Sequence, residues 1–228
     1  MSTSGTYTFN PSLGELTVYA YQLIGVRPTA LLQEHIDASR TATNMMFANW
    51  SNRGVNLWQV TSTTQTLTQG TSQYSVAANT VVVLDAYVTV TSGGVSTDRI
   101  ILPISRTEYA SYPNKTQQGF PTVFWFDRLL SPTITLWPVP DGNEVSLTYY
   151  SVLRIQDANM NGTEQVDIPP IWLEAFAYGL AYRLAMIWAP EKALPLKAVA
   201  DEAYEIAAAQ NVETAQQYIS PQISGYFR

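Results

Sequence analysis

The hydrophobic pattern of this chain of 228 residues changes its period twice. Apolar residues recur at helical spacing as far as Gly54, give way to alternating runs from Val55, and return to helical spacing at Pro169. Because a helix repeats about every 3.6 residues and a strand every second residue, one segment cannot satisfy both patterns. The order predicts an α+β fold, in which a helical core from both chain ends carries an inserted β-rich module, a sandwich or barrel-like unit.

Residues 1–55 are predicted to form the N-terminal helical hairpin of that core. Asn10 and Pro11 suit the cap and the first turn of one helix, and Gly25 suits its end. A second helix is expected to begin near Pro28, after a very short turn.

Residues 56–156 are predicted to form the inserted β module. They are rich in Val, Thr, Tyr and Trp, and Gly93-Gly94 and Asp141-Gly142 are placed as hairpin turns would be. A polar segment, residues 105–119, interrupts the pattern. Five runs are typical of strands: residues 80–90, 97–104, 122–127, 133–137 and 145–155.

Residues 157–219 are predicted to supply the two C-terminal helices of the core. Residues 171–188 are apolar on almost every face, which predicts a central position among the helices, and Asp167 is expected to cap this helix. Pro190 ends it, and the last helix is expected at about residues 191–218.

Two charged residues, Glu174 and Arg183, interrupt the apolar helix. A charge that is removed from water needs a partner of opposite sign. We therefore expect each of them to meet an opposite charge, either in the helical core or across a subunit boundary.

Residues 220–228 form a short C-terminal arm. Proline cannot continue a helix, so the chain is expected to leave its last helix at Pro221. The arm is too short to bury its own apolar side chains, and we expect it to dock on a neighbouring protein. Its docking residues are predicted to be Ile223, Tyr226, Phe227 and Arg228.

The composition favours subunit interfaces over nucleic-acid binding. Charged residues make up only 13% of the chain, about half of the usual share of roughly 25%, and the net charge is −6. A surface that is poor in charge and rich in Tyr and Trp is typical of interfaces, whereas phosphate binding needs clustered Lys and Arg. We expect no secretion signal and no membrane span.

Few residues are available for chemistry. The chain has no cysteine, and its one histidine, His35, lies on an apolar helix stripe, which favours packing or capping over catalysis. Residues 157–163 match the first half of a calcium loop, but Ile168 stands where a bidentate Glu is needed, so a turn is favoured. No catalytic residue, cofactor or metal is expected.

Aromatic clusters and strand carboxylates leave two alternatives open. Residues 120–127 and 136–141 are rich in aromatic rings, which favours core packing, although a carbohydrate- or receptor-binding module could use exposed rings on one β face. A hydrolase would need two carboxylates that converge in a cleft. Nothing in the spacing pairs any two of the candidates, Asp85, Asp98, Asp127 and Asp141.

Three packing and turn motifs follow one another along the chain. Residues 42–58 contain Trp50-Ser51-Asn52-Arg53-Gly54, residues 121–128 precede Leu136-Trp137-Pro138-Val139-Pro140-Asp141, and Ile168-Pro169-Pro170-Ile171-Trp172 opens a helix. In this order they resemble the head-to-tail adaptors of tailed bacteriophages, also called connector or head-completion proteins, of the tail tubular protein A type. The resemblance spans nearly the whole chain.

This resemblance implies a structural virion protein without enzymatic activity, assembled in the host cytoplasm. Such adaptors form a ring, expected to be twelve-fold, that joins the portal protein to the tail tube or nozzle and continues the DNA channel. Duplex DNA is expected to pass through it during genome ejection without sequence-specific binding.

The resemblance also implies that the C-terminal segment docks on the portal, which assigns Ile223, Tyr226, Phe227 and Arg228 to portal binding. Simpler adaptors lack so large a β module, so its neighbour stays open among tail fibres, the nozzle and the adjacent adaptor. The alternative function is a receptor- or carbohydrate-binding β module of a phage tail or spike.

Overall fold

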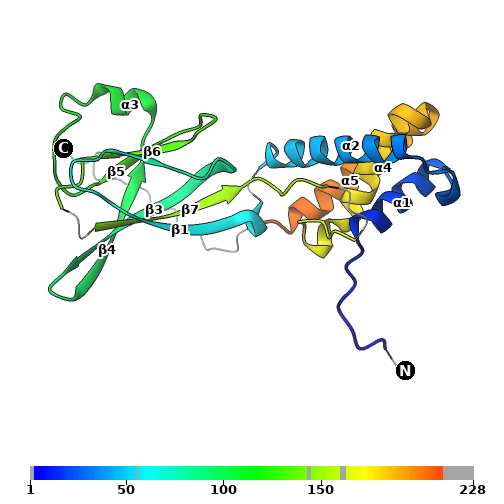
Figure 1. Ribbon diagram of the computed structural model, residues 1–228, viewed down its shortest axis with the longest axis horizontal. Coiled ribbons are helices and arrows are strands. Elements are labelled where there is room, and N and C mark those ends of the chain that lie inside the picture. The colour runs from blue at the N-terminus through cyan, green and yellow to red at the C-terminus, as the bar shows by residue number, and fades with distance from the viewer. Residues whose placement is uncertain (1–2, 55, 143–144, 160–162, 213–228) are drawn as a thin grey trace, which may run out of the picture.

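The computed structural model describes residues 3–54, 56–142, 145–159 and 163–212. The molecule is elongated, with a bundle of helices at one end and a curled sheet at the other (Figure 1). Helices from both ends of the chain lie together in the bundle, and the strands come from the middle of the chain. The predicted α+β fold, a helical core with an inserted barrel-like β module, is confirmed.

Helix α1 (Leu13–Ile24) begins two residues later than predicted. Its cap is Ser12, not Asn10, because Ser12 and Glu15 satisfy each other's backbone groups in a capping box. The Ser12 N–H donates to Glu15 Oε2 over 2.8 Å, and the Glu15 N–H donates to Ser12 Oγ over 3.3 Å. Gly25, at φ 93°, ends the helix as predicted.

Helix α2 (Gln33–Ser51) also begins later than predicted, because Pro28–Ala30 forms a separate 3₁₀ turn, η1. His35 sits at its start, where the Leu32 N–H donates to His35 Nδ1 over 3.1 Å. The imidazole ring stacks on Trp188 with 4.2 Å between the ring centroids. The predicted packing or capping role of His35 is confirmed.

Helix α4 (Leu173–Trp188) is the centre of the bundle and contacts α1, α2 and α5 (Pro190–Ala209). A short 3₁₀ turn, η3 (Pro170–Trp172), leads into it. Gly179 lets α2 approach closely, because a Cβ there would lie 2.7 Å from Met46 Sδ. Helix α5 ends at Ala209 instead of near residue 218, since residues 210–212 are not helical.

The predicted capping role of Asp167 is wrong. The turn η3 has no side-chain cap, and Asp167 Oδ2 instead accepts from Gln59 Nε2 over 3.0 Å and from the Gln156 N–H over 3.1 Å. Asp167 therefore ties together the two connections between the helices and the sheet.

The strands form one seven-stranded sheet with the order β1-β7-β3-β4-β5-β6-β2. Only the pair β4–β5 is parallel among these neighbours. The sheet curls around its own buried cluster of side chains, so the barrel-like alternative holds and a two-sheet sandwich is wrong. The bounds are β1 (Val60–Thr66), β2 (Gln73–Ser75), β3 (Thr80–Ser92), β4 (Val95–Pro103), β5 (Val123–Asp127), β6 (Thr133–Trp137) and β7 (Val145–Leu153).

All five predicted strands are present, and β1 and β2 are additional. Gly93 and Gly94, at φ 59° and 80°, form the predicted β3–β4 turn. The polar segment 105–119 contains a short helix, α3 (Arg106–Ser111). In the described part of the chain, no helix has the length and apolarity that a membrane crossing requires.

The helices and the sheet have separate buried clusters. This separation is in keeping with the predicted divisions at residues 55 and 156, which remain predictions, and the division at residue 219 lies outside the described residues. Asn44 on α2 joins the segment after β7, since its Nδ2 donates to the Ala158 carbonyl over 3.2 Å and its Oδ1 accepts from the Ala158 N–H over 2.8 Å.

Replacing Asn44 by Ala is expected to lower the free energy of unfolding by about 1–3 kcal/mol, because both backbone groups of Ala158 lose their partner. Urea unfolding followed by circular dichroism measures the loss. Asn49→Ala, on the exposed side of the same helix, is the control and should change stability by less than about 0.5 kcal/mol. Equal losses in both variants would contradict the bridging role.

Candidate interaction surfaces

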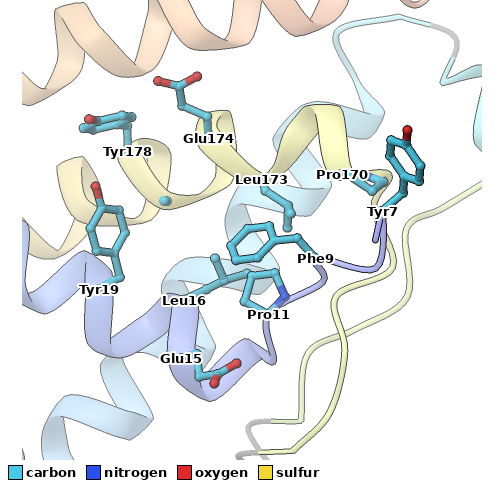
Figure 2. A pocket seen from close by; sticks show the side chains of 11 residues that line it. Tyr7, Phe9, Pro11, Glu15, Leu16, Tyr19, Pro170, Leu173, Glu174 and Tyr178 are labelled. Carbon is cyan, nitrogen blue, oxygen red and sulfur yellow. The ribbon is translucent and has the colours of Figure 1, made fainter. Parts of the chain in front are cut away.

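A groove of about 680 Å³ lies between α1, α4 and the N-terminal segment (Figure 2). Its floor is apolar and includes Leu16 and Leu173, against which the ring of Phe9 lies. Two carboxylates, Glu15 on α1 and Glu174 on α4, and three tyrosines line it as well. We call this surface the acidic aromatic groove; its polar members are Tyr7, Glu15, Tyr19, Glu174 and Tyr178.

The N-terminal segment leaves large aromatic rings in water beside this groove. Tyr7 is fully exposed, and Phe9 keeps 79% of its surface exposed. Exposed aromatic rings next to an apolar groove are typical of a surface that binds another molecule.

The polar residues of the groove differ in their hydrogen bonds and in their electrostatic surroundings. The Glu15 carboxylate accepts from the Ser12 N–H, whereas the Glu174 carboxylate makes no hydrogen bond or ion pair with any residue that the structure describes. The neighbouring Tyr19 hydroxyl, and to a smaller extent burial and the charge of Glu174, raise the pKa of Tyr178. The groove is therefore an electronegative site with one carboxylate free to bind.

A second, smaller groove lies between α2, α4 and α5. The Arg53 guanidinium stacks over the Tyr204 ring, 4.6 Å from its centroid. Arg183 is half-buried beside it, and Asp201 lines the same groove. We call this surface the arginine groove.

Arg183 lacks a carboxylate partner among residues 3–54, 56–142, 145–159 and 163–212. Burial lowers its pKa, the Tyr182 hydroxyl opposes this effect, and the positive charge of Arg53 lowers the pKa further. A half-buried guanidinium beside a second guanidinium is a site that attracts an anion.

Among the helical residues that the structure describes, neither Glu174 nor Arg183 has the predicted charge partner. Glu174 is exposed on α4, so its expected burial in the core is wrong. Arg183 is half-buried but unpaired. The other half of the prediction, a partner across a subunit boundary, stays a prediction.

The aromatic residues of the β module pack on one another. Trp125 stacks on Tyr109 of α3, and Trp137 stacks on Tyr112 with 4.2 Å between centroids. Phe124 is buried inside the sheet. Helix α3 and Tyr112, the residue that follows it, thus cover one face of each indole ring, which favours the packing interpretation over a sugar-binding platform.

Other candidates from the sequence give no assembled site. Asp98 accepts from the Thr89 hydroxyl over 2.6 Å, in keeping with an edge role. The described residues include no group of three His, Cys, Asp or Glu that could hold a metal ion. Residues 160–162 of the calcium-like segment lie outside the described residues, as do the arm residues Ile223, Tyr226, Phe227 and Arg228.

The acidic aromatic groove was not predicted from the sequence, although a signal exists. Glu15 and Tyr19 on α1, and Glu174 and Tyr178 on α4, are each four residues apart, a spacing that puts both side chains on one helix face. This spacing within each helix does not show that α1 and α4 lie side by side.

The comparison with protein families gives one match. The model of the family described as SU10 adaptor protein matches residues 21–224, which covers most of the helical core and the whole sheet. No curated protein matches the chain.

Replacing Tyr19 by Phe is expected to lower the pKa of Tyr178 toward its ordinary value of 10.0, because the hydroxyl that raises it is removed. An alkaline titration of ¹³C-labelled tyrosine by NMR measures this pKa, with Tyr178→Phe to assign the signal. Tyr182→Phe, on the same helix, is the control and should leave the pKa unchanged. A Tyr178 pKa that does not respond to Tyr19→Phe would contradict the groove geometry.

Proposed function

The chain belongs to the SU10 adaptor protein family, and from this membership we propose that it forms the ring that joins the portal to the tail of a phage particle. A structural adaptor role in a virion follows from the family itself. The ring, its portal and tail neighbours and its DNA channel are the finer part of the proposal. The observation that carries it is the family match over residues 21–224.

The surfaces of the single chain support a ring. In a ring with cyclic symmetry each subunit uses two different patches, one for each neighbour. The acidic aromatic groove and the arginine groove are two such patches of opposite charge. A chain with only 13% charged residues is also suited to interfaces.

The proposed role is mechanical and involves no catalysis. His35, the one histidine, is engaged by Leu32 and Trp188, which makes it a structural residue. We propose that the lumen passes duplex DNA without gripping it, since a chain of net charge −6 repels phosphates. The β module would then project toward the nozzle, tail fibres or the adjacent adaptor.

We propose that the C-terminal arm attaches the ring to the portal through Ile223, Tyr226, Phe227 and Arg228. Each large apolar side chain that enters a groove contributes about 1.5–3 kcal/mol, whereas ordering the backbone costs about 1–2 kcal/mol per residue. One arm therefore binds weakly. A ring presents many arms at once, and this multivalency makes the joint firm.

Electron microscopy of virions tests the ring directly. The expected result is a single closed ring of this chain, twelve-fold, between the capsid and the tail. Copies scattered over the capsid or along the tail would contradict the adaptor role.

Deleting residues 222–228 is expected to leave a folded protein that no longer attaches to portals, because the apolar anchors of the arm are lost. Co-sedimentation with purified portal measures attachment, and circular dichroism checks the fold. Replacing only Gln222 and Ser224 by Ala is the control, since the anchors remain. If the truncated protein still attaches and completes heads that retain DNA, the docking role of the arm is wrong.

A further inference from the structure

We propose that the arginine groove of one copy docks on the acidic aromatic groove of the next, with Arg183 of the first copy paired to Glu174 of the second. This inference rests on the proposed ring and names the contact between its neighbouring subunits. It begins from two charged side chains on one helix, neither of which has a charge partner in the described part of its own chain.

The acidic aromatic groove has the chemistry of a guanidinium receptor. A free carboxylate, Glu174, stands beside the rings of Tyr19 and Tyr178 (Figure 2). Arginine binds such sites well, because its planar group forms paired hydrogen bonds to a carboxylate and stacks on aromatic faces. No Lys or Arg among the described residues lines this groove, so that part of the chain does not neutralise its carboxylates.

The arginine groove, in turn, needs a carboxylate to neutralise its positive charge. Arg183 is half-buried without a carboxylate within ion-pair distance, in the portion of the chain that the structure describes. Arg53 adds a second positive charge, and Asp201 only partly offsets the two. A carboxylate from another copy would therefore be stabilised there, since a partly desolvated charge without a partner is unfavourable.

Apolar surface on both sides fits the same contact. Met186 and Ile187, one turn beyond Arg183, keep 57% and 58% of their surface exposed. The floor of the acidic aromatic groove is apolar, and Phe9 at its edge is exposed. The end of α4 in one copy can thus bury its apolar side chains in the groove of the next.

The positions of the two residues on α4 suit a head-to-tail contact, as a ring requires. Arg183 follows Glu174 by nine residues, which is about two and a half helical turns, so the two side chains leave α4 on opposite sides. A subunit that binds through opposite sides of one helix joins its neighbours head to tail. Such heterologous contacts form a closed ring when the rotation from copy to copy closes, and an open filament when it does not.

Cross-linking tests whether positions 174 and 183 of neighbouring copies lie side by side in the full chain, even where the ring is short-lived in solution; it does not test the charge pair, because the variant replaces both charges. The chain has no cysteine, so the double variant Glu174→Cys/Arg183→Cys has only the two thiols of interest. A short bis-maleimide linker should give a ladder of dimers, trimers and higher species. Each single variant should lack the ladder, as should the control Glu174→Cys/Glu108→Cys, whose second thiol is on the β module.

Charge reversal tests whether opposite charges at positions 174 and 183 hold neighbouring copies together. Glu174→Arg and Arg183→Glu are each expected to lose ring formation on portals, because like charges then face each other. The double variant restores opposite charges in every contact and should recover rings, which also shows that loss in the single variants is not a folding defect.

The outcomes separate this pairing from the adaptor role. Single variants that form rings as well as the unmodified chain would overturn the pairing and leave the adaptor role intact, as would cross-linking of Glu174→Cys to the portal. Absence of any ring at the junction of capsid and tail would overturn the proposed function itself.

Discussion

Helix α4 is enclosed by α1, α2 and α5, and its side chains form much of the larger buried cluster. Eight of its sixteen residues are buried, so the helix cannot shift without opening contacts to all three neighbours. Residues of α4 line one side of each groove. The packing of this one helix therefore fixes how far apart the two grooves lie and in which directions they face.

The β module depends on the same helices through a small number of polar contacts. Asn44 holds the segment that follows β7, and Asp167 holds both connecting segments. Because the sheet has its own buried cluster, it needs the helices for its position and much less for its fold. This arrangement suits a protein whose two ends meet different neighbours.

The sequence predicted the elements with a strong local pattern and missed those without one. Strands β3 and β7 are rich in Val and Tyr, whereas β1 is mostly Thr, Ser and Gln and largely exposed, so it shows no apolar alternation. The sequence carries the capping-box pattern of Ser12 and Glu15 beside the cap pattern of Asn10 and Pro11, and the capping box decides where α1 begins. The groove could not be predicted, because it arises where α1 packs on α4, far apart along the chain.

The connections at the base of the sheet have a mechanical consequence. Strand β1 begins and β7 ends beside the helices, and the two are paired from Val60 with Val152 to Thr66 with Ser146. A force that pulls the sheet away from the helices therefore enters both strands from the same end and in the same direction. The hydrogen bonds between them are neither sheared nor unzipped, and tension passes onward into β3 through its ladder with β7.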